Sequence, residues 1–508
     1  MDRSKKTADD RSISGADFLQ LDRAAAPAGA LTDWLAQQLR QAIADGRLLA
    51  GSQLPASRVL AGELRVSRGV VTEAYQRLAE DGQVTAQGRG GTRVAAVPPL
   101  PASAAAEPAR GRPAAAPPSL FRSAPDAGAF DSLRAAPCRI DLTPGVPDMA
   151  MFPRAAWLRA ERTVMGSLSA ASFSYGDPRG TLPLRQAVAS WLARYRGIAA
   201  DPEQMIIVAG VAQALSLLAR VLKWSGLTAV AVEDPGSLGT RQQLQDWDLD
   251  TPPVTVDSSG LRVDELRASG APAVMLTPAH QFPTGVVLDG ARRRELRQWV
   301  QDGGLIIEDD YDAEHRYDRP PVPALRAAMP DRVCYAGSVS KLLAPALRIG
   351  WLLAPPGYHE DLVAAKRRAD LGNAVLPQLV LADLMASGEL ERHLRLQRKR
   401  HVRRRDAMIA AIRTHLPRAR IHGAAAGLHL TVTFDDLPPD TGTADTVIAG
   451  AALDRGVKVQ PLSWHSQRPQ RPGLVLGYAA STPAQITDGI AVVGQALRAT
   501  HGRPRSRR

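Results

Sequence analysis

The sequence contains little cysteine, no long hydrophobic run and fewer acidic than basic residues. Of its 508 residues only Cys138 and Cys334 are cysteines, which argues against a disulfide framework or a cysteine-rich metal site and favours a reducing cytoplasm. No run of about 18 uncharged apolar residues occurs, so we expect no membrane span. The charged N-terminal stretch also lacks the apolar core of a signal peptide.

Acidic residues are outnumbered, since 51 Asp and Glu stand against 63 Lys and Arg for a formal net charge of +12. This excess favours an acidic partner, with nucleic acid first. Part of it lies in residues 395–405 and 503–508, and a charge run is usually the solvated face of a helix. With 45% hydrophobic residues, a chain of this length predicts two or three globular domains.

A lysine lies between two apolar runs, Val333–Ala336 and Ile349–Leu353, which are typical of buried strands. Lys341 follows Gly-Ser-Val-Ser, and Arg348 comes seven residues later. A buried amine is useful when it must be neutral and nucleophilic, as in a Schiff base with an aldehyde. Ser338 and Arg348 would supply a hydroxyl and a planar cation to a nearby phosphate. Pyridoxal 5′-phosphate (PLP) is the cofactor that needs an amine and a phosphate site together.

Strand-like and helix-like segments alternate from Ile140 to about Leu497. This alternation predicts an α/β fold with a mostly parallel sheet and helices on both faces. We expect buried strands at Met205–Val208, Ala229–Glu233, Ala273–Thr277, Leu305–Glu308, Val333–Ala336 and Ile349–Leu353. Helices such as Ala212–Leu222 and Ala291–Asp302 are expected between them. Functional residues should then gather at the carboxyl ends of the strands.

Two of these strand ends carry groups that suit a phosphate and a pyridine ring. After Val208, the small residues Gly210, Val211 and Ala212 open a helix, where backbone N–H groups and the helix dipole can meet a phosphate. The strand Leu305–Glu308 runs into an acidic segment. A carboxylate there, held near a pyridine nitrogen, would keep that nitrogen protonated and strengthen the ring as an electron sink.

The region from Leu31 to Ala95 predicts short amphipathic helices and a hairpin. A first helix over residues 31–43 is followed by one that Ser57 is expected to cap, and by a third that Ser67 is expected to cap. The third helix presents Arg68 and Thr72 outward, as a recognition helix requires. The segment VTAQGRGGTRVA predicts two short strands around a glycine-rich tip that holds Arg89.

This region resembles the winged helix-turn-helix domain of the GntR regulators. The matching pieces are Leu-Pro-Ala-Ser-Arg, Val-Ser-Arg, Ala-Tyr-Gln-Arg-Leu and Gly-Arg-Gly-Gly. The resemblance implies that Arg58 and Arg89 contact phosphates of double-stranded operator DNA, and that Arg68 lies close enough to base edges to read them. Ser67 and Thr72 complete the expected DNA-binding set.

The segment Ser338–Gly350 resembles the lysine motif of fold-type I aminotransferases, S-x-S-K-x-x-x-P-x-x-R-x-G. The resemblance places PLP on Lys341, with Asp309 at the ring nitrogen and Tyr311 at the phenolic oxygen. It assigns the cofactor phosphate to a group of residues comprising Gly210, Val211, Ala212, Ser338 and Arg348. Tyr175 would reach the phosphate of a partner subunit in a head-to-tail homodimer, while His280, in the loop along the cofactor edge, is not expected to be catalytic.

The order of the segments resembles the MocR/PdxR/GabR regulators, which are PLP-dependent transcription factors. The expected parts are a flexible arm (1–29), a GntR-type domain (30–97), a Pro/Ala-rich linker (98–137), a PLP-binding body with a smaller C-terminal α+β subdomain (138–500) and a basic tail (501–508). By this resemblance the protein would sense PLP or a small amine or amino acid.

Two positions depart from the aminotransferase pattern. Ser237 stands where an aromatic side chain normally stacks on the pyridine ring, and Val475 where transaminases place an arginine for the substrate carboxylate. Three functions stay open: a sensing regulator, a working aminotransferase with a DNA-binding head, and a body that has lost PLP and only dimerises the heads. The intact cofactor residues argue against the third, and both departures argue against the second.

Overall fold

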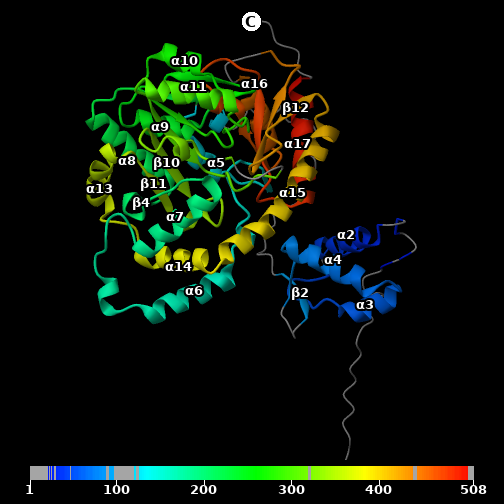
Figure 1. The fold of residues 1–508 in the computed structure, drawn as a ribbon. Coiled ribbons are helices and arrows are strands. Elements are labelled where there is room, and N and C mark those ends of the chain that lie inside the picture. The colour runs from blue at the N-terminus through cyan, green and yellow to red at the C-terminus, as the bar shows by residue number, and fades with distance from the viewer. Residues whose placement is uncertain are drawn as a thin grey trace, which may run out of the picture. The chain divides into compact units, whose positions relative to one another are not determined.

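The structure is a computed structural model that describes residues 21, 23, 26–27, 30–45, 47–86, 91–95, 119–121, 125–126, 128–317, 322–438 and 443–501. The chain divides into two compact units, Met1–Ala114 and Ala115–Arg508, each with its own core (Figure 1). Most of the predicted arm and nearly all of the predicted tail lie outside the described residues. None of the helices in the described part has the length and apolar character that a membrane crossing requires.

The first unit is a small helical bundle followed by a hairpin. Its elements are α2 (Leu31–Ala44), α3 (Ser57–Leu64), α4 (Arg68–Glu80), β1 (Val84–Ala86) and β2 (Thr92–Val94). Apolar residues recur at helical spacing, so Leu39, Leu60 and Leu78 meet in one fully buried core. β1 and β2 pair antiparallel, while the hairpin tip with Arg89 lies outside the described residues. This arrangement confirms the predicted winged helix-turn-helix.

The two predicted serine caps have different outcomes. Ser67 precedes α4, and its hydroxyl accepts a hydrogen bond from the Val70 N–H at 3.4 Å, which confirms the cap. The prediction for Ser57 was wrong, because α3 begins at Ser57 itself and the preceding Ala56 has no side-chain acceptor. The Ser57 hydroxyl instead accepts from the Arg68 Nε at 3.3 Å, since α3 and α4 lie against each other.

The second unit is built on an eight-stranded sheet with the order β4-β11-β10-β9-β8-β5-β6-β7. Its strands are β4 (Met205–Val208), β5 (Val230–Asp234), β6 (Pro253–Asp257), β7 (Gly260–Leu261), β8 (Ala273–Leu276), β9 (Leu305–Asp310), β10 (Val333–Ser338) and β11 (Gly350–Leu353). The neighbours from β6 to β10 pair in parallel, whereas β11 and β7 pair antiparallel. All six predicted strands are present, with ends shifted by at most two residues.

Helices cover both faces of this sheet (Figure 1). They are α6 (Arg154–Ser167), α7 (Leu182–Arg196), α8 (Val211–Trp224), α9 (Leu238–Gln245), α10 (Val263–Ser269), α11 (Gly290–Gln301), α12 (Leu325–Ala328), α13 (Pro356–Asp370) and α14 (Val375–Ala386), with short 3₁₀ turns η4 (Met149–Met151), η5 (Ala170–Phe173), η6 (Pro202–Gln204) and η7 (Pro345–Leu347). Successive strand residues face opposite sides, so Ile206 packs on the α8 side and Ile207 on the α7 side.

The C-terminal part forms the smaller α+β subdomain. An antiparallel sheet contains β12 (Ala419–His422), β13 (His429–Phe434), β16 (Gly473–Gly477) and β15 (Gln460–Pro461), accompanied by α16 (Thr443–Leu453), η8 (Leu462–His465) and α17 (Pro483–His501). The long helix α15 (Glu389–His415) joins the two parts, because Leu390 packs with α7 and Met408 packs in the subdomain core. β3 (Ile140–Asp141) pairs in parallel with β14 (Val457–Lys458).

This unit begins earlier in the chain than the expected boundary at residue 138. The turn η3 (Ser119–Phe121) and the helix α5 (Ala129–Ala135) lie inside the segment expected to be linker. Phe121 is buried, with its ring centroid 5.5 Å from that of Trp464, and Leu133 is buried in the same core. The surrounding proline and alanine concealed these anchors, because a few apolar residues without a period do not predict a packed segment.

Candidate functional site

The predicted cofactor residues come together at one edge of the sheet. β8, β9 and β10 are parallel neighbours, so the chain leaves all three at the same edge. Asp309 is the second-last residue of β9, and it pairs in register with Ala336 of β10. Lys341 follows β10 closely, and Tyr311 directly follows β9. Sheet pairing therefore gathers these three side chains.

Lys341 is half-buried and bonded to a distant part of the chain. Its Nζ donates a hydrogen bond to the Gly145 carbonyl oxygen at 2.5 Å. Burial lowers the pKa of the Lys341 amine, while the carboxylates of Asp312 and Asp309 oppose this effect. Gly145 has φ +83°, and a side chain there would lie 3.2 Å from Nζ. The lysine is therefore held in a confined place that favours its neutral, nucleophilic form more than water does.

Asp309 lies between Glu308 and Asp310, two acidic residues whose carboxylates have partners within the protein. Its Oδ1 is buried and has no hydrogen-bond partner within the described residues, and burial, reinforced by Asp310 and Asp312, raises its pKa to about 7. Glu308 instead accepts two backbone N–H bonds at 3.0 Å each, and Asp310 pairs with Arg196 at 2.5 Å. A buried acceptor without a donor is costly, and a protonated ring nitrogen would remove that cost.

The residues predicted to hold phosphate also converge. Gly210 is the N-cap of α8 with φ +79°, and a Cβ there would lie 3.4 Å from the Arg348 guanidinium. A Cβ on Gly350 would lie 3.0 Å from the Gly210 Cα and 3.2 Å from the Ser338 Cβ. Arg348 also donates to the Ala209 carbonyl oxygen. The N-terminal turn of α8, which includes Val211 and Ala212, thus lies beside a hydroxyl and a guanidinium, as an anion requires.

The two departures from the aminotransferase pattern have structural roles of their own. Ser237 is the cap of α9, and its hydroxyl accepts from the Thr240 N–H at 3.3 Å. Val475 is fully buried in β16 opposite Thr431 of β13. Arg471, the arginine nearest to Val475 in the sequence, could have replaced the missing carboxylate arginine. It is exposed and donates to the Asp435 carbonyl oxygen at 3.2 Å, so its guanidinium is engaged elsewhere.

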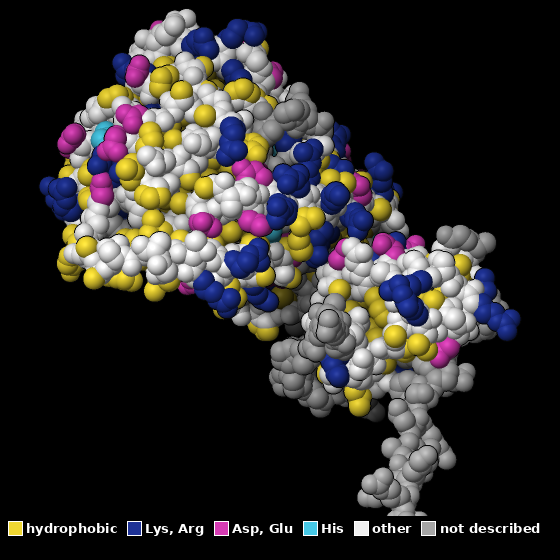
Figure 2. All heavy atoms as spheres, turned by 60° about the horizontal axis from the view of Figure 1, so that its bottom comes forward, with side chains coloured by type: hydrophobic (Ala, Val, Ile, Leu, Met, Phe, Trp, Pro, Cys, Tyr) yellow, Lys and Arg dark blue, Asp and Glu magenta, His cyan; other side chains and the backbone are white. Residues whose placement is uncertain are grey.

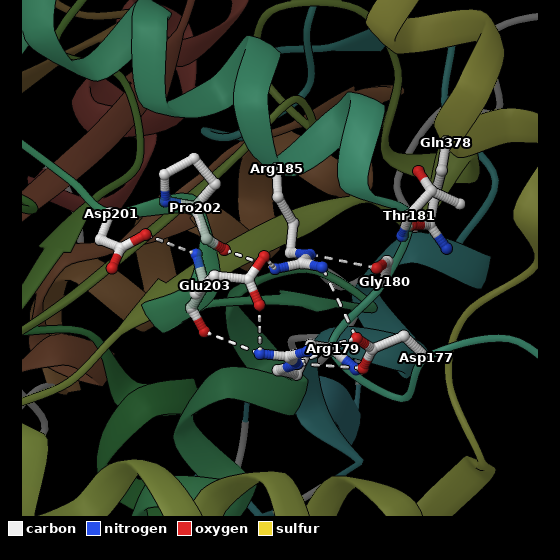
Figure 3. A network of polar contacts seen from close by, with 9 residues as sticks. All are labelled: Asp177, Arg179, Gly180, Thr181, Arg185, Asp201, Pro202, Glu203 and Gln378. Carbon is white, nitrogen blue, oxygen red and sulfur yellow. Dashed lines mark hydrogen bonds and ion pairs between the residues drawn. The ribbon is translucent and has the colours of Figure 1, made fainter.

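Tyr175 lies on a loop whose base is firmly held (Figure 3). Arg179 pairs with Asp177 at 2.7 Å and with Glu203 at 2.8 Å, and the buried Arg185 bonds the same Glu203 at 3.1 Å. Figure 3 shows these side chains converging between the start of α7 and the segment before β4. Tyr175 itself is 89% exposed, so its ring is available to another molecule.

Four of the predicted DNA-binding residues lie on or beside α3 and α4 of the first unit. Arg58, Arg68 and Thr72 are exposed, and Ser67 holds the start of α4 through its cap. The contact between Arg68 and the Ser57 hydroxyl brings the starts of α3 and α4 together. Arg89 lies outside the described residues, so its predicted phosphate contact stays a prediction.

Sequence reasoning missed a histidine–carboxylate contact at the cofactor edge. The His280 Nδ1 lies 2.9 Å from the Asp312 Oδ2 and 3.0 Å from the Tyr311 hydroxyl. His429 of the subdomain lies beside it, with ring centroids 5.2 Å apart. The adjacency of Asp312 to Tyr311 was visible in the sequence, but the approach of His280 depends on the pairing of β8 with β9.

The fold and these sites define a class of protein in which a winged helix-turn-helix domain is joined to a fold-type I aminotransferase body. Residues 31–94 match the bacterial regulatory proteins of the gntR family, and residues 140–487 match aminotransferase class I and II. A solved Pyrococcus horikoshii kynurenine aminotransferase, in complex with PMP, is 26% identical with a TM-score of 0.66, covering 73% of this chain and 93% of that chain.

Two regulators resemble the chain over nearly its whole length. The probable rhizopine catabolism regulatory protein MocR of Rhizobium meliloti is 31% identical, covering 90% of this chain and 91% of that protein. The HTH-type pyridoxine biosynthesis transcriptional regulator PdxR of Corynebacterium glutamicum is 32% identical, covering 90% and 95%. The chain belongs to this MocR-type family of HTH-type transcriptional regulators with an aminotransferase-like domain.

Proposed function

We propose that this regulator holds PLP on Lys341 and changes its binding to operator DNA when a small molecule reaches that site. The observation that carries the proposal is the presence, at the same sheet edge, of a confined lysine amine and a buried Asp309 Oδ1 that finds no hydrogen-bond partner within the described part of the chain. Both groups are costly for stability unless a ligand uses them. We also propose that the protein acts in the cytoplasm, where its thiols stay reduced.

Each residue of the site has a task toward the cofactor. Lys341 would bind the cofactor covalently through its amine, and Asp309 would keep the ring nitrogen protonated. The α8 N-terminus with Ser338 and Arg348 would hold the phosphate, and the Tyr311 hydroxyl would meet the phenolic oxygen. When bound, PLP supplies an aldehyde that amines can exchange on and a ring that withdraws electrons.

A homodimer is part of the proposal. Phe173 and Tyr175 are 66% and 89% exposed, and α6 exposes Leu158 and Met165 on the same unit. α6 lies at the lower edge of this unit in Figure 1, the side that Figure 2 brings forward, where hydrophobic side chains gather. Exposed apolar patches mark interaction surfaces, and the family resemblance supplies a second copy of this chain as the partner, with Tyr175 reaching its phosphate site.

The DNA partner is a double-stranded operator bound through the first unit. Arg68 and Thr72 at the start of α4 suit base edges and phosphates, and Arg58 suits phosphates. A ligand can shift DNA binding only as far as it favours one dimer state over another. The effector is either PLP itself or an amino compound that exchanges with Lys341.

Absorption spectroscopy and borohydride reduction test the cofactor site. The purified protein should be yellow, or become yellow when PLP is added, and borohydride should fix the cofactor to the peptide that contains Lys341. Lys341→Ala should bind no cofactor covalently. The buried Lys366, which bonds Asp370 at 2.5 Å, provides a control, because Lys366→Met should still be labelled at Lys341. A colourless protein that stays colourless with PLP would defeat the proposal.

A working aminotransferase with a DNA-binding head is the second candidate, since the solved Pyrococcus horikoshii protein that shares the fold of the second unit is an aminotransferase. Val475 opposes it, because a substrate carboxylate would lack its arginine and remain loosely oriented. We therefore expect the right ligand to alter operator affinity while conversion to the pyridoxamine form is slow or absent. Following the cofactor spectrum and the DNA complex together decides the matter: rapid stoichiometric conversion with no change at the operator would favour the enzyme.

A further inference from the structure

The side chains of His280, Asp312 and Tyr311 lie within hydrogen-bond distance of one another near the predicted cofactor site. The His280 Nδ1 lies within hydrogen-bond distance of two oxygens, the Asp312 Oδ2 at 2.9 Å and the Tyr311 Oη at 3.0 Å. The His280 and Asp312 side chains are each 1% exposed. The other ring nitrogen, Nε2, is buried and finds no hydrogen-bond partner within the described residues. Within the described residues, both hydrogen-bond contacts of this imidazole therefore converge on Nδ1.

The protonation of the two partners determines whether the His280 Nδ1 donates or accepts in these contacts. An ionised carboxylate only accepts, so the contact with Asp312 requires a hydrogen on the His280 Nδ1. A neutral imidazole with its hydrogen on Nδ1 has no hydrogen on Nε2. Leaving the Nε2 acceptor without a partner costs less than leaving a buried N–H donor without one. A hydrogen on Nδ1 is within reach of both oxygens, the Asp312 Oδ2 and the Tyr311 Oη.

The hydroxyl of Tyr311 therefore receives a hydrogen bond on its oxygen and must turn its own hydrogen elsewhere. Two acceptors can take that hydrogen: Asp312, which the Tyr311 side chain also reaches, and the predicted ring of the cofactor, because Asp309 and Lys341 lie at the adjoining strand ends. Since Asp312 already accepts from His280, the ring is the acceptor that a bound cofactor adds. We infer that His280, held by Asp312, is a positioning residue that directs the Tyr311 hydroxyl toward the phenolic oxygen of the cofactor. This inference rests on the proposed function.

Two glycines leave the space that the His280 ring occupies. Gly427, with φ +82°, lies so close that any Cβ there would collide with the His280 ring, and a Cβ on Gly285, with φ +72°, would lie 3.1 Å from Nε2. His429 packs beside the ring while its own Nε2 lies 3.2 Å from the Pro283 carbonyl oxygen. Two loops of different parts of the body thus close around His280 and fix its orientation.

Two other roles are possible for the same residues, and each predicts something different. A ring that only fills space between Gly285 and Gly427 needs shape and no donor. A divalent cation held by His280, Asp312 and His429, whose ligand atoms lie within 4.8 Å of one another, needs all three ligands. The positioning role instead needs a hydrogen-bond donor at the place of Nδ1.

Three substitutions at His280 separate these roles. The amide nitrogen of His280→Asn falls near the place of Nδ1, the amide of His280→Gln falls near Nε2, and His280→Phe keeps the ring but has no donor. Without a donor at Nδ1, the Tyr311 hydroxyl would donate to Asp312, which lies within its reach. The control is His422→Phe, since His422 lies in the subdomain sheet, where its Nε2 contacts the Thr433 hydroxyl at 3.0 Å.

The measurements are the dissociation constant for PLP and the visible absorption maximum of the bound cofactor, with thermal unfolding as a check on folding. His280→Asn and His422→Phe should resemble the wild type, whereas His280→Gln and His280→Phe should bind PLP about tenfold more weakly with a shifted absorption maximum. Wild-type affinity and spectrum in His280→Phe would overturn the inference, as would stoichiometric metal in the purified wild type that His280→Asn loses. A wild type that binds no PLP at all would instead overturn the proposed function, and this inference with it.

Discussion

We expect the ionised Asp309 to lower the stability of the cofactor-free protein and to strengthen cofactor binding, and both effects can be measured. Its pKa rises from 3.8 to about 7 on folding, chiefly through burial. The folded protein therefore holds this proton more tightly than the unfolded chain does, so stability is lost as the pH rises from about 4 to about 7. Since one pKa unit corresponds to about 1.4 kcal/mol, the ionised carboxylate costs the cofactor-free protein on the order of 4 kcal/mol above pH 7.

Asp309→Asn removes that charge with little change in shape. Relaxation around the site reduces the full cost, so we expect the cofactor-free variant to be about 2 kcal/mol more stable than the wild type at pH 8, with a smaller gain at pH 5. The same variant should bind PLP more weakly, because the protonated ring nitrogen loses its carboxylate. Calorimetry of the cofactor-free proteins and PLP titration measure the two effects.

The neighbouring Asp310 supplies a matched control of opposite sign. It forms a buried ion pair with Arg196, whose side chain is 0% exposed, and it accepts a hydrogen bond from the Tyr335 hydroxyl. Asp310→Asn would leave the arginine uncompensated and should cost about 3–5 kcal/mol at both pH values. A cofactor-free Asp309→Asn protein that melts below the wild type at pH 8 would refute the reasoning, as would unchanged PLP affinity.

Other predictions concern the DNA-binding unit and the dimer. Arg58→Ala should weaken binding to all DNA sequences, whereas Arg68→Ala should cost about 1–3 kcal/mol mainly on the operator; equal operator affinity in both variants and the wild type, by anisotropy, would contradict the assignment. Ser67→Ala removes the bond to the Val70 N–H and should lower the stability of the first unit by about 1 kcal/mol, as its unfolding midpoint would report. Phe173→Asp should shift the protein toward monomer in light scattering, and a fully dimeric variant would place the interface elsewhere.

The residues of the proposed cofactor site could be named from the sequence because they lie in short local segments of the chain. Lys341, Ser338 and Arg348 lie within one short segment between two apolar runs, and Asp309 directly follows another. Parallel strands bring their carboxyl ends to one edge, so a correct prediction of the strands also placed these residues together. The recognition helix was equally readable, since helical periodicity and the Ser67 cap are properties of neighbouring residues.

Where the prediction failed, a contact between distant segments decided the outcome. Ser57 lost its expected capping role because α3 starts at that residue, and Arg68 from the next helix uses its hydroxyl. Phe121 gave no periodic signal, yet it is buried against Trp464 from the far end of the chain. Such contacts follow from how complete elements pack, and a residue's own neighbours in sequence do not specify them.

The division is clearest at the cofactor edge. Residue order and local strand formation are enough to say which strand ends carry the lysine, the carboxylate and the tyrosine. The contact of His280 with Asp312 and Tyr311, and the room that Gly427 of the subdomain leaves for the imidazole ring, depend on the packing of distant segments. The direction of a hydroxyl hydrogen depends on which donors and acceptors surround it in space, and these come from segments that only folding brings together.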